Sequence, residues 1–270
     1  MLKNVALGQY IPGESAIHKL DARTKILAIL VYIVILFMVT DFRGYAFLAL
    51  LPLIVILLTG IDPRTLFGTL RPVVFIIILT VVLHVFMVEG TPLFTLGPLT
   101  ATREGLHQGA FMGLRLILLI LTTSFLTQTT SPIDLTDGLE RLMNPFRVIG
   151  LPAHELAMMM TIALRFIPTL LDEAEKIMKA QMARGADFES GNIFTRAKNM
   201  VPLLVPLFIS AFRRADDLAL AMEARCYRGG KNRTRMKVMK FTSTDAVAAA
   251  VMIALTAGVL VMRFGLLPGR

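Results

Sequence analysis

The sequence has little of what a soluble enzyme uses for its chemistry. Only 17% of its 270 residues are charged, whereas 55% are hydrophobic. This composition is typical of membrane proteins rather than of soluble enzymes. The single cysteine, Cys226, excludes an intramolecular disulfide, and one cysteine does not indicate a cellular compartment.

Motifs of catalytic and metal-binding proteins are also missing. No Gly-x-x-x-x-Gly-Lys-Ser/Thr loop is present, so we expect that the chain does not bind and hydrolyse ATP by itself. The pair Asp216-Asp217 is similar to the acidic pairs that hold magnesium in intramembrane prenyl-transfer enzymes, but no second acidic cluster accompanies it, which favours a solvated helix face. The histidines lack the spacing of metal ligands. They are His18, His84, His107 and His154. We therefore predict a non-catalytic chain without a metal or cofactor of its own.

Five apolar stretches predict an all-α integral membrane protein with about five transmembrane helices. A span needs about 20 residues, so the first two stretches must include flanking residues. The stretches are Ile26 to Val39, Tyr45 to Thr59, Pro72 to Val88, Gly109 to Gln128 and Ala246 to Met262.

The distribution of lysine and arginine predicts the orientation. The net charge of +9 could indicate nucleic acid as a partner, but the basic residues lie beside apolar spans, where cytoplasmic loops are enriched in them. Residues 131–242 contain 17 of the 28 lysine and arginine residues. We therefore predict a multi-pass protein of the cell membrane, with a cytoplasmic N-terminus and no nucleic acid partner. The expected parts are an N-terminal segment with four spans (1–130), a cytoplasmic or interfacial helical coupling module (131–242) and the last span (243–270).

Two runs inside residues 131–242, Leu156 to Leu171 and Met200 to Phe212, are nearly as apolar as the spans. They are either membrane helices or helices that pack under the membrane, partly immersed. Both runs are shorter than about 20 residues and contain interrupting residues, which favours the second interpretation. The interrupting residues are Arg165, Pro168, Pro202 and Pro206.

Two predicted helices end in the same short pattern, Ala-x-x-Ala-Arg. The first ends at Arg184 before Gly185, and the second ends at Arg225 before Cys226. A cation at a helix C-terminus neutralises the unpaired carbonyls, so both arginines can be helix caps. Alternatively, the small alanines leave helix surface that a partner can approach closely, and the partner then pairs with the forked guanidinium.

Two ionisable residues lie within the predicted spans, where such groups are costly and tend to be functional. For His84 we favour a neutral, hydrogen-bonded core group. For Arg115 three interpretations stay open: a hydrogen-bonded core group, a member of a structural ion pair, or a contact to a membrane partner.

The chain resembles the transmembrane T component of energy-coupling factor transporters, the bacterial and archaeal importers of vitamins and metals, over nearly its whole length. Two departures from the family pattern are Ala22, where proline is usual, and Cys226, where glycine is usual. The motifs that carry the resemblance are Gly8-Gln9-Tyr10-Ile11-Pro12-Gly13, His18 to Lys25, Thr129-Thr130-Ser131-Pro132, Ala163-Leu164-Arg165-Phe166-Ile167-Pro168, Ala180 to Phe188 and Ala221 to Gly229.

The resemblance implies a subunit that links two ATPase subunits to a substrate-binding S component in the membrane. ATP and magnesium would be bound by the ATPase subunits. The N-terminal motif is more similar to the shared vitamin-type group than to the dedicated cobalt and nickel group, which remains the alternative together with an intramembrane prenyl-transfer enzyme and a plain membrane scaffold. The residues expected to bind the ATPase subunits are Ala183, Arg184, Gly185, Ala224, Arg225 and Cys226.

Overall fold

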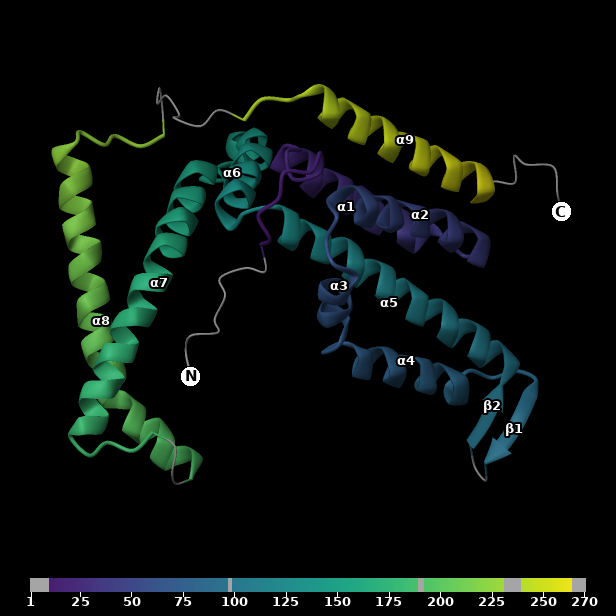
Figure 1. The fold of residues 1–270 in the computed structure, drawn as a ribbon, viewed down its shortest axis with the longest axis horizontal. Coiled ribbons are helices and arrows are strands. Elements are labelled where there is room, and N and C mark those ends of the chain that lie inside the picture. The colour runs from purple at the N-terminus through teal and green to yellow at the C-terminus, as the bar shows by residue number, and fades with distance from the viewer. Residues whose placement is uncertain (1–9, 97–98, 189–191, 231–238, 264–270) are drawn as a thin grey trace. The chain divides into compact units, whose positions relative to one another are not determined.

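The computed structural model describes residues 10–96, 99–188, 192–230 and 239–263, so Gly8 and Gln9 of the N-terminal motif lie outside the described residues. The regular structure in these ranges is almost entirely helical, which confirms the all-α prediction (Figure 1). The chain divides into two compact units. We call Gly8–Leu139 with Val238–Arg270 the apolar-helix unit, and Glu140–Lys237 the helix-pair unit.

Five helices of the apolar-helix unit coincide with the five predicted spans. A short helix, α3, and a β-hairpin were not predicted from the sequence. The elements are α1 (Ala22–Met38), α2 (Phe42–Thr59), α3 (Pro63–Leu70), α4 (Val74–Met87), β1 (Pro92–Leu96), β2 (Leu99–Thr102), α5 (Arg103–Thr129) and α9 (Ser243–Arg263). The two strands pair antiparallel between α4 and α5.

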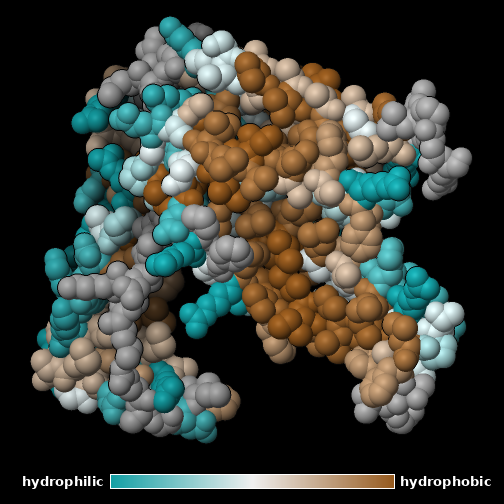
Figure 2. Space-filling view, turned by 45° about the vertical axis from the view of Figure 1, so that its right-hand side comes forward, coloured by the Kyte–Doolittle hydropathy of each residue, from teal (hydrophilic) through white to brown (hydrophobic). Residues whose placement is uncertain are grey.

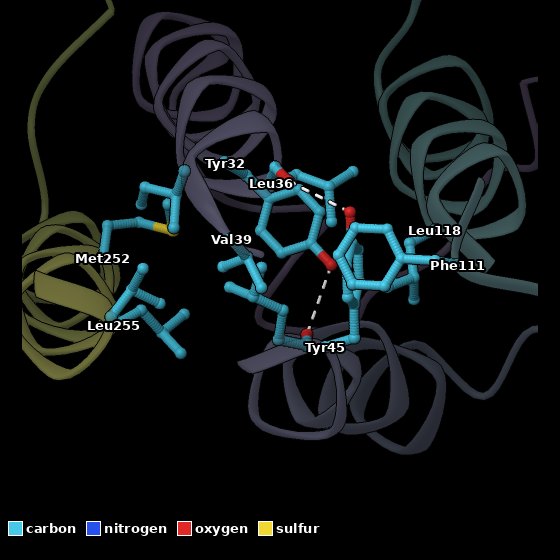
Figure 3. Packing of buried hydrophobic residues seen from close by; sticks show 11 residues of the cluster. Tyr32, Leu36, Val39, Tyr45, Phe111, Leu118, Met252 and Leu255 are labelled. Carbon is cyan, nitrogen blue, oxygen red and sulfur yellow. Dashed lines mark hydrogen bonds between the residues drawn. The ribbon is translucent and has the colours of Figure 1, made fainter. Parts of the chain in front are cut away.

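The core of this unit lies where α1, α2, α5 and α9 meet (Figure 3). The hydroxyl groups of two buried tyrosines are satisfied by backbone carbonyls within it. Tyr32 donates to Leu48 at 3.2 Å, and Tyr45 donates to Leu36 at 3.3 Å. Because a buried hydroxyl without a partner costs free energy, these bonds let tyrosine occupy an apolar core.

Helices α4 and α5 pack closely because α5 presents three glycines to α4. A β-carbon added at Gly105 would lie 2.5 Å from the carbonyl oxygen of His84, and one added at Gly109 would lie 3.0 Å from that of Val81. At Gly113 it would meet the side chain of Val81 at 3.1 Å. Any larger residue at the first of these positions would therefore push the helices apart.

Figure 2 shows a broad apolar surface on one face of the apolar-helix unit. No residue of α4 is buried, and its Phe75 is 73% exposed. On α2, Leu57 is 74% exposed. Such a surface is stable in lipid, which covers it as well as protein would. By length and composition, α2, α5 and α9 can each cross a membrane, and α3 with α4 can do so as a bent pair. Helix α1 has 17 residues and needs its flanks, as predicted.

The helix-pair unit consists mainly of two long helices, α7 (Ala153–Ala183) and α8 (Ile193–Ala224). They follow α6 (Pro132–Met143) and a 3-10 turn at Asn144–Ile149. Ser131 caps α6 by accepting a hydrogen bond from the backbone N–H of Asp134 at 3.1 Å.

The prolines within the apolar runs of this unit do not end the helices. Helix α7 continues through Pro168, and α8 continues through Pro202 and Pro206. A proline inside a helix removes one hydrogen bond, but the neighbouring bonds hold the chain helical on both sides. By length and composition α7 can also cross a membrane. The interfacial placement of α7 and α8 thus stays a prediction.

Candidate functional site

Helix α7 ends in a Schellman cap at the first arginine motif. The N–H of Gly185 donates to the carbonyl of Met182 at 2.9 Å, and the N–H of Ala186 donates to that of Gln181 at 3.0 Å. Gly185 has a φ of +88°, a left-handed conformation that glycine adopts without steric cost. Arg184 is therefore the C-cap residue, directly before the chain turns away.

Helix α8 ends in the same cap at the second motif. The N–H of Cys226 donates to the carbonyl of Glu223 at 2.8 Å, and the N–H of Tyr227 donates to that of Met222 at 3.0 Å. Cys226 has a φ of +56° and, within the described ranges, is the one residue other than glycine with a positive φ. The repeated sequence pattern thus folds into a repeated geometry, with Arg225 in the place of Arg184.

Both helix ends are accessible to a partner. In the described part of the chain, neither guanidinium has a hydrogen bond or ion pair, so both arginines keep their full donor capacity. All six predicted site residues are exposed: Ala183, Arg184, Gly185, Ala224, Arg225 and Cys226.

Helices α7 and α8 run antiparallel and are bridged by an ion pair. The Nη2 atom of Arg214 on α8 lies 2.6 Å from the Oε2 atom of Glu173 on α7. Further along α7, the side-chain amide of Gln181 donates at 3.4 Å to the carbonyl of Pro202. Pro202 precedes Arg214 in α8. The C-terminal ends of the two helices therefore lie at opposite ends of the pair (Figure 1).

The two arginines are equally far from this ion pair along their helices. Arg184 follows Glu173 by 11 residues, and Arg225 follows Arg214 by 11 residues. At 1.5 Å per residue, each arginine lies about 16 Å beyond the bridge. Sequence reasoning did not find this bridge. Its only signal was a pair of opposite charges on two adjacent predicted helices, which gives no register.

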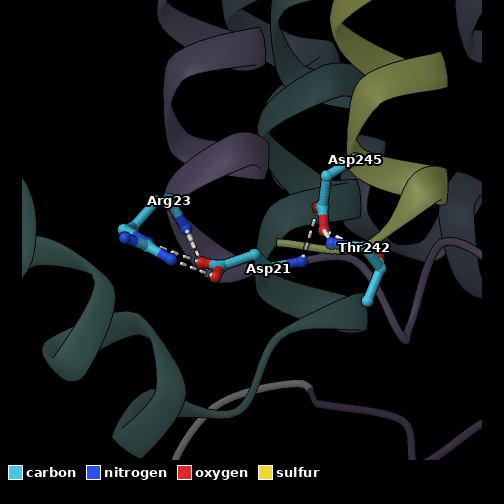
Figure 4. A network of polar contacts seen from close by, with 4 residues as sticks. All are labelled: Asp21, Arg23, Thr242 and Asp245. Atoms are coloured by element: carbon cyan, nitrogen blue, oxygen red, sulfur yellow. Dashed lines mark hydrogen bonds and ion pairs between the residues drawn. The ribbon is translucent and has the colours of Figure 1, made fainter. Parts of the chain in front are cut away.

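The apolar-helix unit contains a polar network where α1 and α9 begin (Figure 4). Asp21 caps α1 by accepting from the backbone N–H of Arg23 at 2.9 Å, and it accepts from the Arg23 guanidinium at 2.7 Å. The N–H of Asp21 in turn donates to Asp245 at 2.9 Å, and Asp245 accepts from Thr242 at 2.8 Å. These bonds join the first and last spans.

Burial of Asp21 acts to raise the pKa of its carboxyl group. The hydrogen bonds and the charge of Arg23 outweigh this effect, so that the pKa of Asp21 lies below its ordinary value. Lys25, one turn into α1, is buried and donates to the carbonyl of Thr129 at 2.8 Å and to the hydroxyl of Thr130 at 3.2 Å. The family-like segments His18 to Lys25 and Thr129-Thr130-Ser131-Pro132 thus contact each other.

Arg115 is held by aromatic residues. Its Nε atom donates to the Tyr45 hydroxyl at 2.7 Å, and its guanidinium lies 5.1 Å and 5.4 Å from the ring centroids of Phe37 and Phe111. A cation at these distances is attracted to the faces of the rings. Among the described residues no carboxylate lies within 4.0 Å of it, so an ion pair would need a residue of another chain or one outside the described ranges.

The remaining polar candidates have ordinary surroundings. His84 is hydrogen-bonded through Nδ1 to the carbonyl of Thr80 at 2.8 Å within its own helix, so the expected hydrogen bond is present, but the side chain is only half-buried and is not part of a core. Asp216 and Asp217 are exposed on α8, as a solvated face predicts. No group of three or more histidine, cysteine or acidic side chains that could hold a metal occurs in the residues that the structure describes.

These features define a multi-pass helical membrane protein with two equivalent, exposed arginine-tipped helix ends. A family model described as "Cobalt transport protein" (CbiQ) matches residues 13–236. The chain belongs to this family, and within it to the transmembrane components of energy-coupling factor transporters, as its relatives show.

Those relatives carry the name "Energy-coupling factor transporter transmembrane protein EcfT". The protein of Thermosediminibacter oceani is 60% identical over 263 residues, which cover 97% of this chain and 99% of that protein. The protein of Clostridium kluyveri is 58% identical over 251 residues, which cover 92% of this chain and 93% of that protein. The protein of Bacillus subtilis is 46% identical over 264 residues, which cover 97% of this chain and 100% of that protein. The chain is thus the energy-coupling transmembrane subunit of such a transporter and is not itself an enzyme.

Proposed function

We propose that Arg184 and Arg225 are the two points at which this subunit binds two cytoplasmic ATPase subunits, one at each helix end. The observation that carries the proposal is the repetition of one geometry. Two arginines occupy the same position in two Schellman caps, both are exposed, and they lie at opposite ends of one antiparallel helix pair. Two docking points for two equivalent partners would need the same geometry twice, whereas two arginines that only cap their own helices would not.

The chemistry of docking follows from the side chains. A guanidinium donates two parallel hydrogen bonds to a carboxylate, and the exposed alanine before each arginine lets a groove close around the helix end. ATP and magnesium bind to the ATPase subunits, and the opening and closing of the ATPase pair moves α7 and α8. This movement tips or releases a substrate-binding S component held in the membrane.

The remaining parts of the proposal concern topology and substrate. The N-terminus and residues 131–242 face the cytoplasm, as the lysine and arginine distribution indicates. The resemblance of residues 8–13 to the shared vitamin-type group supports several interchangeable S components for vitamins or similar micronutrients. Contacts to the substrate itself belong to those S components.

Charge reversal at the two arginines tests the proposal. Loss of one member of a buried charge pair costs about 2 to 5 kcal/mol, which corresponds to a loss of affinity of roughly 30-fold to several thousand-fold at that contact. Arg184→Glu and Arg225→Glu should each weaken copurification of the ATPases and substrate uptake, and the double variant should abolish both. Arg196→Glu is the control, because Arg196 is exposed on α8 but outside the motifs. Full binding and transport by the double variant would show that the arginines are only helix caps.

A further inference from the structure

The end of α8 that carries Arg225 is fixed by a side-chain network around His154. The Nδ1 atom of His154 lies 3.0 Å from Oε1 of Glu140, and the Nε2 atom of His154 lies 3.3 Å from the hydroxyl of Tyr227. The backbone at Gly230 packs directly against the same imidazole ring. All four residues belong to the helix-pair unit. One histidine thus connects α6, the start of α7 and the turn after α8.

Tyr227 has two roles in this arrangement. Its backbone N–H makes the bond to Met222 that closes the cap of α8, and its side chain makes the bond to His154. Only one residue lies between Tyr227 and Arg225. A contact that fixes the Tyr227 side chain therefore fixes the direction in which the chain leaves α8, and with it the base of the Arg225 side chain.

The end of α7 is held in another way. Ala186 occupies the position that corresponds to Tyr227, and its methyl group cannot form a hydrogen bond. The side-chain amide of Asn199 donates to the backbone carbonyl of Asp187 at 2.6 Å, and that of Gln181 donates to the carbonyl of Pro202 at 3.4 Å. The two arginines thus have the same cap but different supports.

We propose that His154, oriented by Glu140, is a positioning residue for the Arg225 docking point and acts through Tyr227. With Nδ1 protonated, the imidazole donates to the Glu140 carboxylate, and its Nε2 atom is left to accept from the Tyr227 hydroxyl. The histidine is mostly covered, since its side chain is 27% exposed, and Glu140 is covered further at 11%. The proposal rests on the proposed docking role of Arg225 and adds that the two docking points depend on different residues of this subunit.

The test is a set of double-variant cycles read out as affinity for the purified ATPase subunits, with the full chain in lipid nanodiscs. Tyr227→Phe removes only the hydroxyl, so the variant keeps its size and cap. It should lower the affinity about 2- to 10-fold in the wild-type chain and in Arg184→Ala, but cause no further loss in Arg225→Ala. His154→Phe should give the same pattern, and the two substitutions together should lose no more than one alone. Tyr10→Phe, at an exposed tyrosine, is the matched control and should leave the affinity unchanged.

Each alternative result has a distinct meaning. Equal losses from Tyr227→Phe in the Arg184→Ala and Arg225→Ala backgrounds would show a general effect on the subunit and overturn the positioning role. Unchanged affinity of Tyr227→Phe beside a weakened Arg225→Ala would overturn the positioning role and leave the docking proposal standing. Unchanged affinity of Arg225→Ala itself would overturn both.

Discussion

Gly185 and Cys226 occupy the same position in two Schellman caps, at φ values of +88° and +56°. The left-handed conformation costs about 1 to 2 kcal/mol for a residue with a β-carbon and nothing for glycine. The cap of α8 therefore forms with a residue that does not suit it. This conformational strain occurs at the helix end that is also held by the contact of His154 with Tyr227.

Replacing Cys226 by glycine should stabilise the protein. Relief of the left-handed strain is partly offset by the greater flexibility of glycine in the unfolded chain, which leaves a gain of roughly 0.5 to 1 kcal/mol. The reverse change, Gly185→Ala, introduces the strain at the other cap and should destabilise by about 1 kcal/mol. The midpoint of thermal unfolding in detergent should rise for the first variant and fall for the second. A fall for Cys226→Gly would mean that the thiol makes a contact that outweighs the strain.

A Gly105→Ala substitution should destabilise the packing of α4 on α5. The new methyl group would lie 2.5 Å from a backbone carbonyl oxygen, which cannot move without moving α4, and such overpacking costs about 1 to 3 kcal/mol. Gly68→Ala on α3 is the same substitution in open space and should be neutral or stabilising by up to about 1 kcal/mol. Thermal unfolding of the two variants compares them directly. Equal midpoints would show that α4 shifts freely.

Arg115→Met should lower stability and membrane yield more than Arg103→Met does. The first substitution removes a charged donor to Tyr45, and hydrogen bonds to charged groups contribute about 1.5 to 3 kcal/mol, less where water reaches the group. Arg103 is exposed at the start of α5. Yield and unfolding midpoint of the two variants are to be measured side by side. Equal behaviour would indicate that Arg115 extends to water and contributes little.

Asp21 should make the junction of the first and last spans sensitive to acid. Its pKa is lowered in the folded protein, so its contribution is present above the unfolded pKa of about 4 and is lost as the pH falls through the folded value. Asp21→Asn should therefore lower the unfolding midpoint at pH 7. The midpoint of this variant should then fall less between pH 7 and acidic pH than that of the wild-type protein. Asp62→Asn, at an exposed aspartate, is the control. An unchanged acid limb in Asp21→Asn would place the sensitivity elsewhere.

The placement of α7 and α8 can be decided by labelling. In a Cys226→Ser background, a cysteine at Asn192 should react from the cytoplasmic side, and one at Leu93 in the β-hairpin should react from the outside. Both positions are exposed. If α7 and α8 instead cross the membrane, Asn192 lies outside and both cysteines react from the same side. That result would replace the five-span topology.

The sequence alone predicted what depends on local composition. The apolar stretches became α1, α2, α4, α5 and α9, because the length and polarity of a stretch are properties of the local sequence. The two arginine motifs were also found, because a repeated pattern is visible without a fold.

What was missed depends on contacts between distant residues. The ion pair of Glu173 with Arg214 joins residues 41 positions apart, and the contact of His154 with Tyr227 joins residues 73 positions apart. Neither pair has a pattern that marks it in the chain. The continuity of α7 through Pro168 could not be decided from the sequence for a related reason, because the flanking turns decide whether a proline ends a helix or only weakens it.

The Glu173 and Arg214 bridge divides the helix pair into two arms of equal length. Each arginine lies about 16 Å along its helix from the bridge, so if the pair turned as one body about this point, the two ends would move by equal amounts in opposite directions. The bridge itself is partly exposed, and ion pairs of this kind contribute only about 0 to 1 kcal/mol, so it does not by itself lock the two helices together. Under the proposed function, partners bound at the two arginines would therefore act on the helix pair with equal leverage.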